Sequence, residues 1–166
     1  MPQPAILYIS YDGMLEPLGQ SQVISYLEGL TDEAAIHLIS FEKRADWDEK
    51  SNREAISRRL NNANIVWHPL RYHKSPSVPA TLYDILQGTI VALWLCLRYR
   101  IKMVHARSYI SALIGLFTKK LAGTKLLFDM RGLWADERTD GGIWPENGRI
   151  YRTVKALERH LLLQSD

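Results

Sequence analysis

The sequence has little cysteine, no long uninterrupted hydrophobic run and only a slight excess of one charge. One cysteine in 166 residues excludes an intramolecular disulfide framework and a cysteine-cluster metal site, so we expect a reducing, cytoplasmic environment. The most apolar stretch, Ile85–Leu97, is broken by Gln87, Gly88 and Thr89. It is shorter than the roughly 20 residues that a membrane-spanning helix needs, and it predicts a buried helix instead.

What remains is the composition of an ordinary globular domain. Hydrophobic residues make up 46% and charged residues 23% of the chain, which excludes wholesale disorder, collagen and coiled coil. The net charge of +3 and the pI of about 9.0 permit an anionic partner without requiring one, and a nucleic acid is not among the partners that we expect. The N-terminal segment has no basic region and no cleavage site, so we expect no export.

Short apolar runs alternate with helical patterns along the chain. The expected strands are Ala5–Ser10, Ala35–Phe41, Asn64–Leu70, Ile101–Ala106 and Lys125–Met130. The expected helices are Gln20–Leu30, Trp47–Leu60, Thr81–Tyr99, Tyr109–Leu121 and Gly148–Leu163, with a surface loop at Arg71–Pro79 and an irregular segment at Arg131–Asn147. Because right-handed crossovers make the strands of such units parallel, the sequence predicts a doubly wound α/β domain with a mostly parallel sheet. The last helix presents an apolar face and then stops, so we expect residues 1–166 to be one domain of a longer protein.

The loop Tyr11–Gly19, after the first strand, is the first candidate for a site. Ligands of open parallel sheets bind beyond the carboxyl ends of the strands. Gly13 and Gly19 are six residues apart, so the loop is neither a G-x-G-x-x-G motif nor a P-loop. It is either a turn that needs glycine for its backbone or a diphosphate or sugar contact at Gly19.

Two later strand ends carry further candidates. Strand alternation places His105 and Arg107 on one face; the histidine is a structural hydrogen-bonding group or a base, and the arginine suits a carboxylate or phosphate. By the same alternation Asp129 and Arg131 share a side and could pair. Trp134 would add a flat apolar wall for a sugar ring or a lipid, and the glycine-rich segment that follows fits a mobile lid or an acceptor loop.

Other polar groups fit a structural role better. His68 and His73 lack metal-ligand spacing, and Cys96 lies in an apolar helix. The basic residues of the last helix could meet acidic lipid headgroups, although a solvated face is the simpler interpretation: Arg149, Arg152, Lys155 and Arg159.

Three parts of the sequence together resemble the N-terminal domain of bacterial GT-B glycosyltransferases of the group 1, family 4 type. They are Ile6–Gly13 with Glu16–Val23, Val104–Tyr109 and Phe128–Glu137, in that family's order and at its spacing. The resemblance implies two facing Rossmann-like domains, of which the N-terminal one binds the acceptor and the C-terminal one holds the nucleotide-sugar through an E-x7-E element. No two glutamates here are eight apart, so the chain resembles the acceptor half alone, without the donor-binding domain.

The resemblance also implies an activity. It is a retaining transfer of a sugar from a nucleotide-sugar to a glycan or a lipid-linked acceptor, at the inner face of the cytoplasmic membrane and without a metal or other cofactor. Gly19 and Gln20 would face the donor diphosphate, and His105 and Arg107 would be the catalytic candidates near the reacting sugar. The acceptor-side residues would be Asp129, Arg131, Trp134, Asp136 and Glu137. Leu18 stands where many relatives have a glycine, which alters the approach of the backbone to the diphosphate.

Peripheral contact with an anionic membrane is expected on the same grounds, with weaker support from the basic last helix and from Trp134 and Trp144. Two other classes fit parts of the pattern. A non-catalytic Rossmann-like module could bind a nucleotide or a glycan without chemistry. A dinucleotide oxidoreductase fits poorly, because the first loop lacks the required glycine spacing and only Glu42 is available for a ribose.

Overall fold

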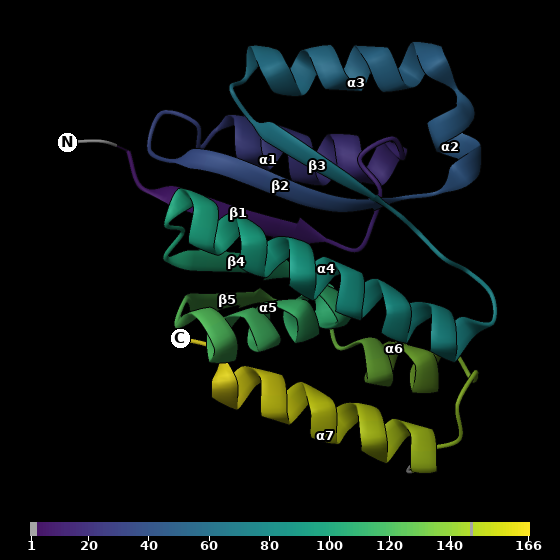
Figure 1. Cartoon of the computed structure of the whole chain (residues 1–166). Helices are drawn as coiled ribbons and strands as arrows, with labels where there is room; N and C mark the ends of the chain where they lie inside the picture. The colour runs from purple at the N-terminus through teal and green to yellow at the C-terminus, as the bar shows by residue number, and fades with distance from the viewer. Residues whose placement is uncertain (1–2, 147) are drawn as a thin grey trace.

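Five parallel strands form one sheet in the order β3-β2-β1-β4-β5, in a computed structural model that describes residues 3–146 and 148–166 (Figure 1). The strands are β1 (Ala5–Ser10), β2 (Ala35–Glu42), β3 (Val66–Arg71), β4 (Met103–Arg107) and β5 (Lys125–Asp129). Pro69 has no N–H for the ladder, and it is tolerated because β3 is an edge strand that pairs only with β2 in this sheet. The predicted doubly wound α/β class is confirmed.

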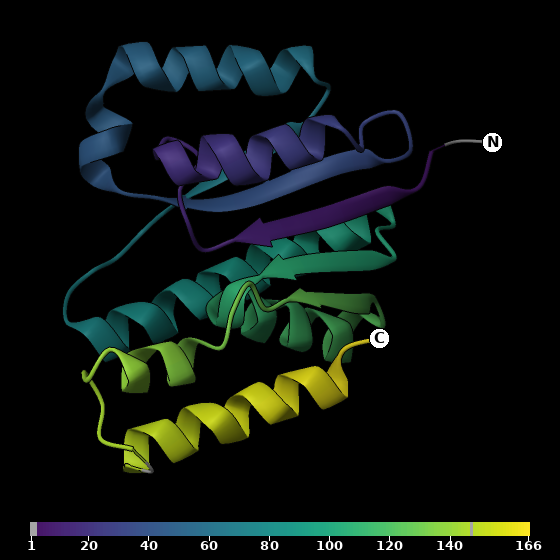
Figure 2. The ribbon, with the colours of Figure 1, turned by 180° about the vertical axis from the view of Figure 1, so that it is seen from behind.

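The helical elements are η1 (Gly19–Ile24), α1 (Ser25–Glu28), α2 (Arg44–Asp48), α3 (Lys50–Asn62), α4 (Ser77–Tyr99), α5 (Ser108–Ala122), α6 (Trp134–Asp140) and α7 (Arg149–Gln164). Helices α4 and α5 cover one face of the sheet, and η1, α1 and α3 cover the other (Figures 1 and 2). Helix α7 packs beside α5 and α6 at the β5 side of the domain.

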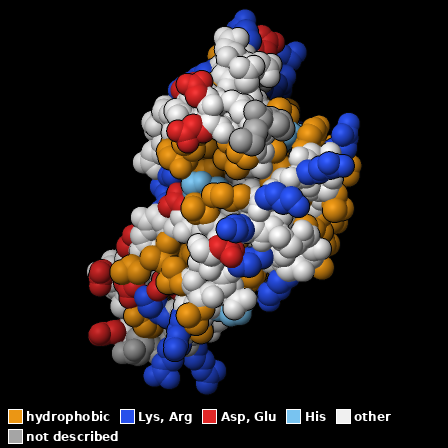
Figure 3. Space-filling view, turned by 90° about the vertical axis from the view of Figure 1, so that its left-hand side faces the viewer, with side chains coloured by type: hydrophobic (Ala, Val, Ile, Leu, Met, Phe, Trp, Pro, Cys, Tyr) orange, Lys and Arg blue, Asp and Glu red, His pale blue; other side chains and the backbone are white. Residues whose placement is uncertain are grey.

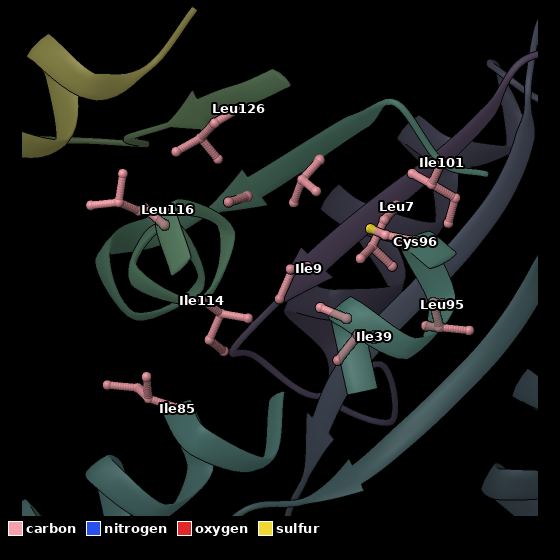
Figure 4. Close-up of a cluster of buried hydrophobic side chains, with 14 of the residues drawn as sticks. Leu7, Ile9, Ile39, Ile85, Leu95, Cys96, Ile101, Ile114, Leu116 and Leu126 are labelled. Carbon is pink, nitrogen blue, oxygen red and sulfur yellow. The ribbon is translucent and has the colours of Figure 1, made fainter. Parts of the chain in front are cut away.

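Alternation along the central strands divides the core between these two layers. Leu7 and Ile9 of β1 point toward α4 and α5, where a large apolar cluster includes the buried Cys96 (Figure 4). Tyr8, between them in sequence, points to the other face and packs with the η1 and α1 side chains. Burial raises the pKa of the Cys96 thiol to about 11, which agrees with its expected inert role.

Four details of the predicted elements were wrong. The segment expected to be irregular contains α6, and the single helix expected over Trp47–Leu60 is the pair α2 and α3. The helix expected to begin at Gln20 opens with η1, a π-helical turn. The helix expected to be well buried, α4, buries one face only, and Leu86, Ile90 and Leu97 on it are exposed.

Candidate functional site

The carboxyl edge of the sheet is the place where this topology positions a site. Strands β1 and β4 are neighbours in the sheet. After β1 the chain continues to β2 on one side of this pair, and after β4 it continues to β5 on the opposite side. Such a reversal opens a crevice between the loops that follow the two strands. Here those loops carry Asp12 after β1 and Ser108 after β4, with Asp129 at the end of the adjacent β5.

A cluster of two arginines, two aspartates and a glutamine lies at this edge. Arg107, which is 8% exposed, donates from Nη2 to Gln22 Oε1, and its Nη1 lies 3.6 Å from Asp129 Oδ2. Arg131 donates from Nη2 to the same Gln22 oxygen at 3.2 Å, and its Nη1 lies 3.0 Å from Asp12 Oδ2. The cluster joins the ends of β1, β4 and β5 to the η1 helix.

The pairing expected between Asp129 and Arg131 side chains was wrong. Asp129 accepts the backbone N–H of Arg131 at 3.2 Å, whereas the Arg131 guanidinium turns toward Asp12. The backbone explains this geometry, because Arg131 has a positive φ of 63° and so reverses the chain directly after β5. Ser108, with a φ of 72°, does the same after β4. Left-handed backbone at non-glycine residues costs about 1 kcal/mol each, and here both positions border the cluster.

The first loop is held from inside by a buried carboxylate. Glu42, which is 2% exposed, accepts the backbone N–H groups of Met14 and Leu15 at 2.8 and 3.2 Å and the Ser40 hydroxyl at 2.5 Å. Burial raises the pKa of the Glu42 carboxyl, while these donors favour its charged form. Glu42 therefore shapes the loop that precedes η1.

Gly19 and Gln20 also hold this loop. A Cβ at Gly19 would lie 2.1 Å from the carbonyl oxygen of Gly13, so the two parts of the loop approach too closely for any side chain there. The Gln20 side-chain amide donates to the carbonyl of Leu15 at 3.1 Å. The requirement for glycine is thus explained by packing within the loop, whether or not a ligand also binds there.

His105 shares a face with Arg107, as alternation predicts, and it is 8% exposed. Its ring packs at 4.5 Å from the Tyr8 ring and at 5.8 Å from the Tyr26 ring, between ring centroids. Burial lowers the pKa of His105, an effect that Asp129 opposes and Arg107 reinforces, so the imidazole is neutral at physiological pH. Within the described part of the chain its Nε2 has no hydrogen-bond partner.

An aromatic-walled hollow of about 370 Å³ lies beside the cluster. Its walls are formed by Ser108, Tyr109, Ile110, Met130, Arg131, Gly132, Trp134 and Glu137. Trp134 is held by Trp144 at 5.0 Å and by Tyr109 at 6.1 Å, between ring centroids, and one of its faces carries the Arg138 guanidinium at 5.7 Å. The hollow offers flat apolar walls with Arg131 at its rim.

Asp136, grouped with these residues by sequence, points elsewhere. It accepts the Tyr151 hydroxyl at 2.8 Å and the Lys155 ammonium at 2.9 Å, and so joins α6 to α7. These two contacts lower the pKa of its carboxyl. Lys155 also pairs with Glu158 at 2.6 Å, so this member of the basic stripe is engaged within the domain.

Sequence reasoning missed Gln22, Asp12 and Tyr109. Asp12 and Tyr109 lie two residues past strand ends, which was the available signal, and Gln22 lies on η1. Only the fold shows that the Gln22 side-chain oxygen accepts from two arginines. It also missed a buried group on α4: Asp84, fully buried, accepts the Tyr11 hydroxyl at 2.9 Å and His73 Nδ1 at 2.6 Å. His73 was expected to have no special role, and its ring and backbone both hold the loop before α4 through this carboxylate.

Among residues 3–146 and 148–166, no three His, Cys, Asp or Glu side chains converge in a way that could hold a metal ion. The sequence was also expected to lack D-x-D, a pair of aspartates that holds a metal in other glycosyltransferases, and this was wrong, because one occurs at Asp46–Asp48. It lies on α2, where side chains two residues apart point in different directions, and Asp48 is exposed and lies 3.6 Å from Arg44. Its geometry does not bring the two carboxylates together.

No protein-family model matches the sequence, and no curated protein matches it. Among solved structures, the chain is similar to a glycosyltransferase from Rickettsia africae ESF-5, with a TM-score of 0.50 and 15% sequence identity over 77% of this chain. The match covers 30% of that protein, so the chain spans less than a third of its length. At this identity the likeness shows the fold alone, which is a Rossmann-like α/β domain with a five-stranded parallel sheet.

Proposed function

We propose that residues 1–166 are the acceptor-binding half of a retaining glycosyltransferase, which moves a sugar from a nucleotide-sugar donor to a glycan or a lipid-linked acceptor. The observation that carries the proposal is the aromatic hollow at the carboxyl ends of β4 and β5, which Arg131 lines and beside which Arg107 shares the Gln22 oxygen with Arg131. Flat aromatic walls suit a sugar ring, and guanidinium groups suit phosphate or carboxylate. The likeness of the fold to a glycosyltransferase supports the same assignment.

In this proposal the residues at the carboxyl edge have three roles: binding the acceptor, stabilising charge near the reacting sugar, and facing the donor diphosphate. Trp134, Arg131 and Glu137 contact the acceptor in the hollow, and Asp129 and Asp136 hold the elements around it. Arg107 lies closer to the reacting sugar and stabilises charge on the leaving diphosphate, with the neutral His105 beside it. The donor diphosphate faces the loop at Gly19 and Gln20, and no metal takes part. The protein works in the cytoplasm, peripherally at an anionic inner membrane face.

Acceptor binding can be tested on this chain. Oligosaccharides and glycolipid headgroups are titrated by ligand-observed NMR against the wild type, Trp134→Ala and the matched control Trp94→Ala, which removes an exposed tryptophan from α4. We expect Trp134→Ala to weaken binding by roughly tenfold and Trp94→Ala to leave it unchanged, since aromatic stacking contributes about 1 kcal/mol or more. Equal binding by all three proteins would contradict the proposed acceptor site. Binding of a nucleotide alone would favour the non-catalytic module.

The transferase assignment needs a chain that joins these residues to a donor-binding domain. Such a protein should transfer sugar from a nucleoside diphosphate sugar, and Arg107→Ala should lower its kcat by about a hundredfold, since a lost charge-stabilising donor typically costs about 3 kcal/mol. Residues 1–166 alone should show no turnover. Turnover by this chain alone would contradict the division into two halves.

A further inference from the structure

Helix α4 has one face that packs on the sheet and one that packs on nothing within the described chain. Its inner face buries Ile85, Gly88 and Leu95 against the sheet and α5. Its outer face carries a row of large apolar side chains, three or four residues apart, that are each 56–74% exposed: Val78, Leu82, Leu86, Ile90, Trp94 and Leu97. Over the 19 residues between the ends of this row a helix rises about 29 Å, so the row is a long apolar strip.

The helix belongs to the domain despite this composition. It is long and apolar enough to cross a membrane, with a mean hydropathy of 1.5, but core helices of soluble proteins can have the same length and hydropathy. The fully buried Asp84 and the packed inner face tie α4 to β1 and to the loop before it. The helix can therefore lie on an apolar surface without leaving the sheet.

The charged residues in the sequence of α4, α5 and their flanks are nearly all basic. From Tyr72 to Thr124, the sequence of α4, α5 and their flanks has one acidic residue, the buried Asp84. Exposed basic residues lie before the start of α4, in the last turns of α4 and α5, and just after α4: Lys74, Arg98, Arg100, Lys102 and Lys120. In Figure 3, which faces the amino ends of the strands, hydrophobic side chains run down the right-hand border, the α4 side, with Lys and Arg side chains beside them.

We propose that this α4 face lies on the surface of a bilayer that contains anionic lipid. An apolar strip with basic ends matches the acyl and headgroup layers of such a bilayer, and Trp94, Tyr83 and Tyr99 on the helix suit the boundary between them. If two copies of the chain packed together through this face, the basic residues near the two strips would lie close to each other and repel. The proposal does not depend on sugar transfer, and it locates the membrane contact on α4 rather than on α7 or the Trp134 loop.

The position of α4 links this surface to the candidate site. Its first turn follows β3 and lies at the carboxyl edge, where Tyr11 of the first loop contacts Asp84. A bilayer lying along α4 would therefore run up to the same edge of the sheet as the hollow.

The test is flotation of the 166-residue chain with vesicles of phosphatidylcholine alone and of phosphatidylcholine mixed with phosphatidylglycerol. We expect binding to the anionic vesicles, reduced at high salt. Leu86→Glu with Ile90→Glu should abolish it, because both side chains are exposed and charge opposes burial in lipid. The matched control, Ile150→Glu with Leu163→Glu on α7, changes the net charge equally at exposed apolar positions and should still bind. Arg98→Gln and Lys102→Gln should each lower partitioning roughly fivefold.

Circular dichroism checks that each variant is folded, and Leu86→Ser with Ile90→Ser replaces the glutamate pair if that pair unfolds. Vesicle binding that survives the α4 substitutions, or that is lost equally in the α7 control, would overturn the proposal. The proposal would also be overturned if the wild type were a dimer in sedimentation velocity, the α4 variant were a monomer, and neither the wild type nor the variant bound vesicles. Failure to bind sugars would leave this result unaffected, and failure to bind vesicles would contradict the membrane contact of the proposed function but not its sugar site.

Discussion

Arg107 and Asp129 are register partners: the last residue of β4 stands opposite the last residue of β5, and the Nη1 of one lies 3.6 Å from the Oδ2 of the other. The pairing follows directly from parallel strands that end together. It brings an almost buried guanidinium to a carboxylate that is one-third exposed. The remaining contacts of Arg107 depend on a different element, because Gln22 belongs to η1.

A double-mutant cycle should separate these contributions to stability. Arg107→Ala should lower the free energy of unfolding by about 1–3 kcal/mol, because Gln22 and Asp129 both lose a charged partner. The coupling between Arg107→Ala and Asp129→Ala should stay below about 1 kcal/mol, since the pair is long and partly solvated. Urea unfolding measures both quantities. A coupling as large as the whole effect of Arg107→Ala would show that Gln22 contributes nothing.

Gly19→Ala should destabilise the chain by about 1–3 kcal/mol, because its Cβ would meet the Gly13 carbonyl oxygen at 2.1 Å and force the loop apart. Gly29→Ala is the matched control: its nearest neighbour would be 3.4 Å away, and its φ of −72° suits alanine. Thermal unfolding of the two variants should therefore differ. A Gly19→Ala protein as stable as Gly29→Ala would mean that the loop can open at little cost.

Asp84→Ala should be the most damaging polar substitution among these. Its carboxylate is fully buried and accepts the Tyr11 hydroxyl together with the ring and backbone N–H of His73. Removing it leaves three half-buried donors without an acceptor, at about 3 kcal/mol in total, whereas Tyr11→Phe removes one hydrogen bond and should cost about 1 kcal/mol. Chemical unfolding gives both values. Equal effects would show that the carboxylate has replacement partners.

Stability should fall as the pH drops from 6.5 toward 4. Nδ1 of His37 on β2 lies 3.1 Å from Nε2 of His68 on β3; burial, and then the charge of His37, lowers the pKa of His68 to about 4. Burial also lowers the pKa values of His37 and His105. The unfolded chain therefore binds more protons in this window, and each proton taken up favours unfolding.

Melting temperatures measured across that range should decline less steeply in His68→Gln than in the wild type. His160→Gln, at an exposed position on α7, is the control and should follow the wild-type slope. An unchanged slope in His68→Gln would mean that other groups account for the acid sensitivity.

The strand pattern was readable from the sequence because fully buried parallel strands are short apolar runs. Ala5–Ser10 was predicted with the bounds that the structure has, and the other strands differ by a few residues at their ends. Helix α6 was missed because Gly141, Gly142 and Pro145 follow it closely, and these residues indicate loop. The exposure of the α4 row could not be predicted, since apolar residues lie all around most of this helix and do not show which face is covered.

The polar cluster was predicted in place, but the partner predicted for Arg131 was wrong. Strand ends identified Arg107, Asp129 and Arg131 as neighbours, because the carboxyl ends of parallel strands meet at one edge. The partner of Arg131 is Asp12, which is distant in sequence. The pairing requires the left-handed backbone of Arg131, which cannot be predicted from the residue type.

The central claim is that the carboxyl edge of the sheet is a sugar-binding site, and amide chemical shifts test it most directly. An oligosaccharide and a nucleoside diphosphate are titrated into labelled chain, and the shifted amides are assigned. The account predicts that the glycan shifts residues 108–110 and 130–137 around the hollow, and that Trp134→Ala removes these shifts. Shifts confined to the amino edge of the sheet, or the same shifts in Trp134→Ala, would contradict it.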